Sequence, residues 1–187
     1  MLRLILVVMT AATVTLVIAA AFFSGSGAVE KVDARALGLF RAGKSEEAIG
    51  AWREGLAKHP DSPRLHFGLG TALAVVGARH AVPATEAIEH LETAVRLAPA
   101  EPEYRRELAI CYLQQGRDGD AERELKAVLA RADWFPDAHY YLGRVYEARG
   151  DRDAALGEYV RELNVNPCST FAWAKVQSWE KGPPSTK

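Results

Sequence analysis

The most continuous hydrophobic pattern in the chain lies at its beginning. The run from Leu4 to Phe23 contains no charged side chain. A helix of about twenty residues rises roughly 30 Å, which is the thickness of the hydrocarbon core of a bilayer. Arg3 precedes the run, whereas charges of both signs follow it. By the positive-inside rule, residues 1–28 are predicted to be a signal anchor and linker, with a transmembrane helix over Leu4–Phe23 and a cytoplasmic N-terminus.

A cleaved signal peptide is the alternative reading of this segment. Its apolar region would be shorter, about 7–15 residues, but Ser26-Gly27-Ala28 is an acceptable small-residue cleavage site. Both readings place the remainder of the chain on the same side of the membrane. We therefore expect a single-pass protein of the inner membrane with a periplasmic domain, or a secreted protein cleaved near Ala28.

Beyond the linker, apolar and small residues recur with a period close to 34 residues. In the last two units Leu108, Tyr112, Gly116 and Ala121 are matched, each 34 positions later, by Leu142, Tyr146, Gly150 and Ala155. An earlier unit matches through Leu69, Leu73, Gly77, Ala87 and Leu91, and a weaker one through Leu39, Gly43, Ala48 and Trp52. Such self-similarity indicates a repeat architecture of stacked helix pairs.

The period and the residue types closely resemble the tetratricopeptide-repeat (TPR) family, of a membrane-anchored periplasmic type. The resemblance implies an all-α superhelix of about four helix-turn-helix repeats, preceded by the transmembrane helix. The TPR domain is expected over residues 29–181, with repeats at about 30–62, 63–101, 102–135 and 136–169. A capping helix should span 170–181, and residues 182–187 should form a disordered tail.

Helix-end signals refine this prediction. The mid-unit glycines suit helix C-termini. Prolines are expected in the first turn of the first helices, at Pro63, Pro102 and Pro136. Side-chain caps are expected at the start of the second helices, from Ser45, Thr85, Asp118 and Asp151. The second unit carries five extra residues within 78–86, which are predicted to lengthen the turn between its helices.

Composition and charge narrow the functional classes. Lys and Arg number 23 against 24 Asp and Glu, for a formal net charge of -1, so there is no clustered basic surface to suggest nucleic acid. Cys111 and Cys168 are too few for a disulfide framework. The five histidines show no metal-ligand spacing, and His66 and His139 share a repeat position, which indicates a common packing role. We expect a non-enzyme with no cofactor, metal or small-molecule substrate.

The resemblance also implies a concave face, lined by the first helix of each pair, that binds protein partners. The positions carried over to this face are Phe40, Arg41, Phe67, Thr71, Arg106, Ile110, Gln114, Tyr140, Arg144 and Glu147. Secondary contacts are expected at Trp134, Phe135 and His80. Phe67, Thr71 and Arg106 stand where some TPR domains carry the lysines and asparagine that grip a chaperone's C-terminal carboxylate, so that clamp is absent.

These features favour a non-catalytic scaffold, a membrane-anchored subunit or assembly factor of a multi-protein membrane complex such as a redox or photosynthetic one. Its partners would be other subunits of that complex, with residues 4–23 in the membrane. The alternative is a periplasmic chaperone-like maturation factor that binds exported polypeptides, as in c-type cytochrome biogenesis.

Overall fold

The structure is a computed structural model that describes residues 27–80 and 84–180. Residues 27–41 are helical, and eight helices follow. They are α2 (Ser45–Lys58), α3 (Pro63–His80), α4 (Thr85–Leu97), α5 (Pro102–Gln114), α6 (Asp118–Leu129), α7 (Ala138–Ala148), α8 (Arg152–Val165) and α9 (Thr170–Glu180). All regular structure in these two ranges is helical, which confirms the predicted all-α class.

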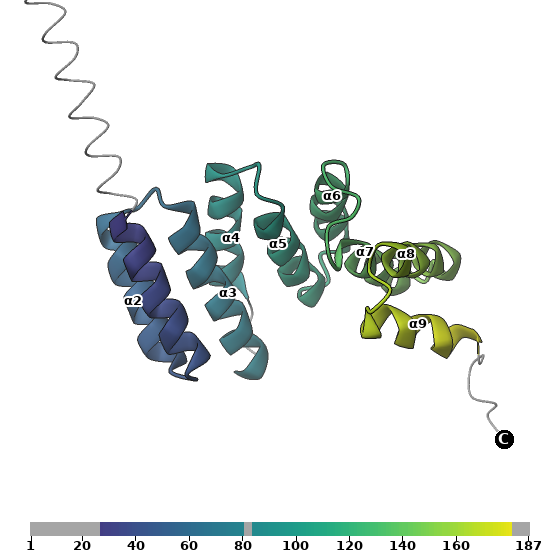
Figure 1. The fold of residues 1–187 in the computed structure, drawn as a ribbon, viewed down its shortest axis with the longest axis horizontal. Helices are drawn as coiled ribbons and strands as arrows, with labels where there is room; N and C mark the ends of the chain where they lie inside the picture. The colour runs from purple at the N-terminus through teal and green to yellow at the C-terminus, as the bar shows by residue number, and fades with distance from the viewer. Residues whose placement is uncertain (1–26, 81–83, 181–187) are drawn as a thin grey trace, which may run out of the picture.

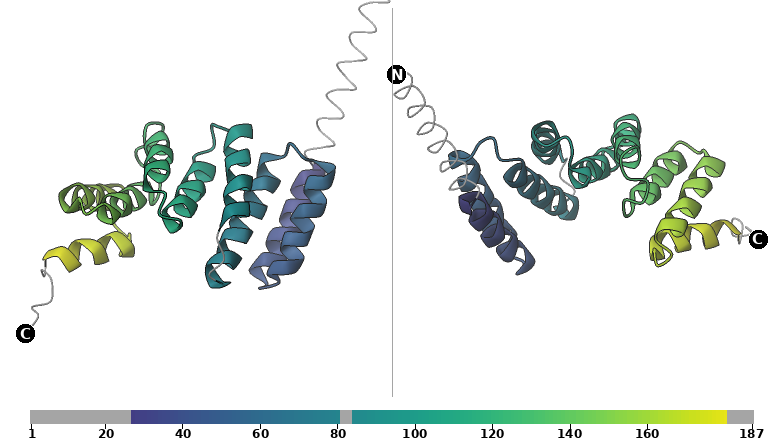
Figure 2. Two further views of the ribbon diagram at one scale, coloured as in Figure 1. Left: turned by 180° about the vertical axis from the view of Figure 1, so that it is seen from behind. Right: turned by 45° about the horizontal axis from the view of Figure 1, so that its top comes forward.

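The helices form antiparallel pairs stacked along one axis (Figure 1). The most extensive contacts join α3 with α4, α5 with α6 and α7 with α8. Each second helix then packs on the first helix of the next pair, and α9 packs on α8. Successive pairs are rotated, so the array curves (Figure 2). Contacts between α3 and α5 and between α5 and α7 place the first helices together on one face of the curve.

Small residues lie where paired helices cross, as the repeat pattern predicts. A Cβ atom on Gly70 would come within 2.8 Å of Leu91 and 3.0 Å of the carbonyl oxygen of Ala87. Leu91 is fully buried beside this crossing, in a cluster that continues into α5, α6 and α7. The close approach of two helices at a small residue lets the neighbouring large side chains reach interior packing density.

The mid-unit glycines end three of the first helices as expected. Gly43, Gly116 and Gly150 have φ angles of 80°, 69° and 80°, a conformation that favours glycine. Gly77 differs, because α3 continues through it to His80. The prediction that the extra residues only lengthen the turn was therefore wrong. Part of the insertion extends α3, since alanine and arginine after Gly77 are strong helix formers.

Two groups of predicted helix ends also differ from the structure. Of the four predicted side-chain caps, only Asp151 accepts a hydrogen bond, from Ala154 N at 3.1 Å. Ser45, Thr85 and Asp118 are instead the first helical residues. The turns before Ser45 and Asp118 are closed by backbone hydrogen bonds from Lys44 N to Leu39 O and from Arg117 N to Tyr112 O.

The start of α7 is the other correction. Pro63 and Pro102 begin α3 and α5 as expected, but α7 begins at Ala138, two residues after Pro136. Asp137 between them has a φ of 63°, which no helix can include. The connection first turns Phe135 inward, to 8% exposure, and this delays the entry into the helix.

Among residues 27–80 and 84–180, no helix is both long and apolar enough to cross a membrane. The predicted span Leu4–Phe23 and the predicted tail 182–187 both lie outside the described residues, and both remain predictions.

Candidate protein-binding face

All of the predicted groove residues lie on the first helices of the pairs, and their exposure differs along the array. At the N-terminal end, Asp33 accepts a hydrogen bond from Trp52 Nε1 at 2.9 Å and lies 3.9 Å from Arg64. The half-buried ring of Phe40 lies 6.1 Å from that of Trp52 and packs on the same core cluster. Of the two residues predicted here, Arg41 is exposed and Phe40 contributes to packing.

The middle of the face is largely apolar and half-buried. Phe67 stacks on Tyr104 with ring centroids 4.5 Å apart, which joins α3 to α5. Thr71 and Ile110 are half-buried beside this stack on the same two helices, and Gln114 at the end of α5 is exposed. The hydroxyl oxygen of Thr71 is buried without a hydrogen-bond partner among the described residues.

Arg106 is less available than its predicted role requires. Its guanidinium lies 5.5 Å from the centre of the Phe135 ring and 2.9 Å from the carboxylate of Glu107. Its Nε is buried and has no partner among the described residues. Arg106 thus holds the connection before α7 against α5, since a cation over an aromatic face is stabilising.

The C-terminal end of the face contains a hollow. Three predicted residues, Tyr140, Arg144 and Glu147, line one hollow of about 430 Å³, together with Ala148 and Lys175. Glu147 accepts hydrogen bonds from Lys175 Nζ and the Tyr159 hydroxyl, both at 2.7 Å. The nearby Lys175 ammonium and Tyr159 hydroxyl keep the pKa of Glu147 below its usual value, although burial opposes them. Arg144 is exposed.

Two residues of α9 lie at this C-terminal end, and the repeat pattern did not identify them. Phe171 is 65% exposed, and its ring lies 5.7 Å from that of Tyr140. Lys175 closes the hollow through its pair with Glu147. The sequence predicts a capping helix here, but none of its residues was among the predicted groove positions. In the 34-residue register Phe171 corresponds to Asp137 and Lys175 to Tyr141, neither of which was a predicted groove position, so the repeat pattern carried no direct signal for them.

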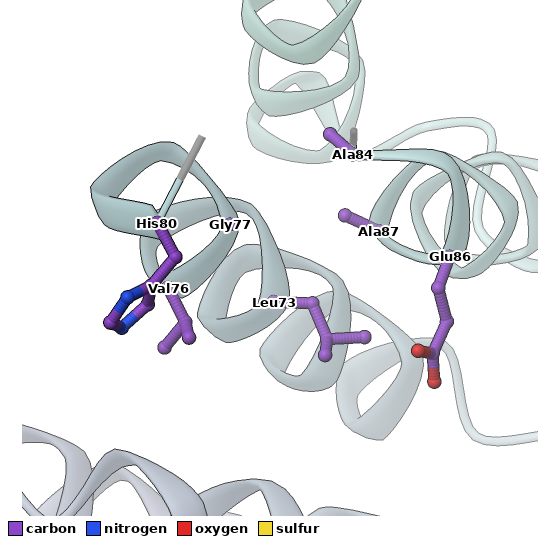
Figure 3. Close-up of a pocket in the computed structure, with 7 residues that line it drawn as sticks. All are labelled: Leu73, Val76, Gly77, His80, Ala84, Glu86 and Ala87. Atoms are coloured by element: carbon purple, nitrogen blue, oxygen red, sulfur yellow. The ribbon is translucent and has the colours of Figure 1, made fainter. Parts of the chain in front are cut away.

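The predicted secondary contacts separate into different environments. Phe135 is 8% exposed and packs with Val128 and Ala138, so it fills the gap before α7. Trp134 beside it is 66% exposed. His80 lies elsewhere, at the end of α3, on the rim of an apolar hollow of about 240 Å³ lined by Leu73, Val76, Gly77, Ala84, Glu86 and Ala87 (Figure 3). The structure does not bring His80 together with the two aromatic residues.

Reactive groups on the described helices are few. Cys111 and Cys168 are both free thiols. Burial raises the pKa of Cys111 to about 12, so this thiol stays protonated and unreactive at neutral pH. In residues 27–80 and 84–180, no cluster of three or more His, Cys, Asp or Glu side chains could hold a metal ion.

Comparison with protein families agrees with this architecture. Two family models, each described as tetratricopeptide repeat, match the chain, one over residues 84–133 and the other over 34–78 and 119–164. This chain is a tetratricopeptide-repeat protein. The three matched segments of the TPR protein include both helices of successive pairs, from the first described helix to α8.

Solved structures share the TPR fold at low sequence identity. MamA has a TM-score of 0.67 at 24% identity, covering 76% of this chain and 81% of its own. PilF of Pseudomonas aeruginosa has a TM-score of 0.72 at 20% identity, covering 83% and 68%. YrrB, a TPR protein with an unusual peptide-binding site, has 0.52 at 18%, covering 82% and 97%. No curated protein sequence matches the TPR protein significantly.

Proposed function

We propose that this TPR protein is a non-catalytic scaffold that binds an extended segment of a protein partner along its first-helix face. We further propose that it acts as a membrane-anchored subunit or assembly factor of a multi-protein membrane complex. The observation that carries the binding proposal is the open hollow between α7 and α9, lined by Tyr140, Arg144, Glu147 and Lys175.

The side chains around this hollow suit protein recognition. Phe171 offers an exposed aromatic ring and Arg144 an exposed guanidinium, the residue types that most often dominate binding energy at protein interfaces. Glu147 and Lys175 hold each other in place, so part of the polar lining is ordered before a partner arrives. A preorganised lining lowers the entropy cost of binding.

The membrane part of the proposal depends on the uncharged run Leu4–Phe23. A tether to the membrane raises the effective concentration of a partner that is also membrane-bound, without any additional contact. This advantage favours a subunit or assembly factor over a freely diffusing adaptor.

Co-purification from the native membrane tests the function directly. The full chain, isolated in a mild detergent, should carry one or a few membrane-complex proteins in near-stoichiometric amounts, identified by mass spectrometry. A chain that elutes alone would contradict the proposal. The recovery of many exported polypeptides in small amounts would favour the alternative, a maturation factor, for which the half-buried apolar stretch around Phe67 and Ile110 would be the binding surface.

Substitutions can place the partner on the first-helix face. Phe67, Arg106 and Tyr140 all support packing, so alanine there would disturb the fold as well as binding. The exposed residues are better probes. Phe171→Ala and Arg144→Glu should each weaken partner capture at least tenfold, as interface anchors do.

Matched controls come from the second helices. Val160→Ala on α8 removes an apolar side chain that is 43% exposed, and Arg96→Glu on α4 reverses an exposed charge. Neither should alter capture or helicity. If the controls weaken capture as much as the two probes do, the partner does not bind on the first-helix face.

A further inference from the structure

In each of three consecutive units, a pair of polar side chains joins the first helix to the second, and the three pairs occupy equivalent positions. His66 Nδ1 lies 2.9 Å from His90 Nδ1, Arg105 Nη1 donates to Glu124 at 2.7 Å, and His139 Nδ1 lies 2.7 Å from Glu158 Oε2. His66 and His139 thus occupy the equivalent position that their spacing predicted. The α3–α4 pair differs from the other two because neither member carries a permanent charge.

The hydrogen positions of the histidine pair follow from its neighbours. His66 Nε2 lies 2.9 Å from the carbonyl oxygen of Pro60, which can only accept, so Nε2 carries a hydrogen. In a neutral ring the other nitrogen, Nδ1, then has a lone pair. At 2.9 Å the facing His90 Nδ1 must donate to it, because two lone pairs at this distance would repel.

We propose that His66 and His90 hold one proton between them and act as an acid-sensitive latch of α3 on α4. A first additional proton can enter at His90 Nε2, which lies 4.0 Å from Glu86. A second additional proton would put hydrogens on both facing nitrogens and break the bridge. The folded pair therefore accepts at most one additional proton, whereas two separate histidines accept two.

The surroundings of the pair do not compensate for a second charge. Around His90, Glu86 and Glu89 lie on its own helix and Arg53 on α2, and Arg53 pairs with Glu86 at 2.7 Å. Around His66, the contacts are His90 and the Pro60 carbonyl. Burial, and then the charge of His66, lower the pKa of His90 from its usual 6.5.

The sign of the pH effect follows from this count of protons. Below about pH 6.5 both histidines become protonated in the unfolded chain, whereas the folded pair binds fewer protons. The unfolding constant should therefore rise as the pH falls, by up to about tenfold per pH unit for each proton that the fold does not take up. The stabilising effect of the pair is complete above about pH 6.5 and is lost as the pH falls through the lowered pKa of His90.

The latch lies next to the proposed binding face. Phe67 follows His66 directly, and Thr71 lies on the same helix. Loosening α3 from α4 would disturb the stack of Phe67 on Tyr104 in the middle of that face. This consequence for partner binding rests on the proposed function, whereas the latch itself does not.

A substitution that should reverse or weaken the pH dependence of stability tests the latch. His90→Glu gives α3–α4 the His–Glu pairing that α7–α8 already has, and a histidine that gains a carboxylate partner is stabilised by protonation. Because all other titrating groups are the same in both proteins, the change in stability from pH 7 to pH 5 should be markedly less favourable for the wild-type chain than for His90→Glu. His80→Gln removes an exposed histidine outside the pair and should follow the wild type. Parallel pH profiles for all three proteins would overturn the proposal.

Nitrogen-15 NMR of the histidine rings in the wild-type protein gives a second, independent measurement. A shared proton predicts scalar coupling between the two Nδ1 nuclei, and one of the two rings should resist protonation well below pH 6. Two rings that titrate independently near 6.5 would overturn the latch even if His90→Glu fails to fold. Partner capture that is absent at every pH would contradict the proposed function and leave this result standing.

Discussion

Gly143 and Gly157 lie on the two helices of the last pair, and adding a methyl group to each should have opposite effects. A Cβ atom on Gly143 would come within 2.6 Å of the buried Tyr159 ring, whereas one on Gly157 would meet nothing within 4 Å. Gly143→Ala should lower the free energy of unfolding by about 1–3 kcal/mol through overpacking. Gly157→Ala should raise it by about 0.5–1 kcal/mol through helix propensity.

Urea denaturation of both variants checks this pair of predictions. Ala109 occupies the equivalent place on α5, so a methyl group is acceptable there only because Leu125, rather than tyrosine, packs opposite. If Gly143→Ala proved as stable as the wild type, the Tyr159 ring would have to shift easily, which its bond to Glu147 opposes.

Glu162 is the residue with the clearest pH-dependent effect in the last pair. It is fully buried, and its carboxylate accepts hydrogen bonds from Asp137 N at 3.2 Å and Tyr140 N at 3.4 Å, so it caps α7 from α8. Burial raises its pKa, and these bonds only partly offset that. Its folded-state pKa lies above the unfolded value of 4.5, so its contribution to stability is complete below 4.5 and declines as the pH rises.

Glu162→Gln keeps an acceptor and removes the buried charge. At pH 7 the variant should stay within about 1 kcal/mol of the wild type. As the pH falls from 7 toward 4.5, the wild type should gain relative to the variant, since only it can take up the proton. Thermal denaturation across this range measures the difference. A difference that does not change with pH would show that Glu162 has an ordinary pKa.

At the scale of elements, α9 is the element whose role changed most between sequence and structure. Ala172 and Val176 pack on Tyr159, which they help to bury, and Lys175 pairs with Glu147. The helix therefore covers the core of the last pair and also lines the open hollow.

Deleting residues 170–187 should expose Tyr159 and destabilise α7 and α8. Exposure of one large buried side chain costs about 1.5–3 kcal/mol. Amide hydrogen exchange should accelerate in α7 and α8 and stay unchanged in α2 and α3, because α9 packs on α8 and the contacts of α2 and α3 reach no further along the array than α5. A chain that lacks only residues 182–187, the predicted tail, is the matched control. Uniform acceleration along the array would show that it unfolds as a single unit.

At the scale of the whole molecule, the helical array and the predicted membrane anchor depend on different parts of the chain. The helix pairs form a curved, quasi-linear stack, whereas the anchor prediction depends on Leu4–Phe23 alone. Stability and membrane attachment should therefore respond to different changes.

Cell fractionation tests the anchor. The full chain should remain with the membrane after alkaline carbonate extraction, and a chain that begins at Gly27 should be extracted with unchanged helicity. Replacing Leu16 and Ile18 with arginine should also release it, because each charge in a bilayer centre costs about 2.5–3.5 kcal/mol on insertion scales. Release of the full chain by carbonate would favour the cleaved signal peptide.

Much of the fold can be predicted from the sequence, because each repeat carries the same local signals for its helices, its turn and its helix crossing. The recurrence of Leu108 and Tyr112 as Leu142 and Tyr146 is enough to predict the helix pairs, and the glycines at 43, 116 and 150 locate their turns. Small residues such as Gly70 indicate the crossings. These features depend on periodicity and backbone conformation, which neighbouring residues determine.

Only the tertiary structure decided which side chains remain available. Arg106 and Tyr140 are predicted to share a face with Arg144, yet contacts from other elements half-bury Arg106 and bury Tyr140. The inward turn of Phe135, the cap from Glu162 and the facing of His66 and His90 likewise join residues from different helices. A local sequence pattern predicts which face of its own helix a residue occupies. Whether the side chain is buried or shares a proton depends on the residues of the neighbouring helix that pack against that face.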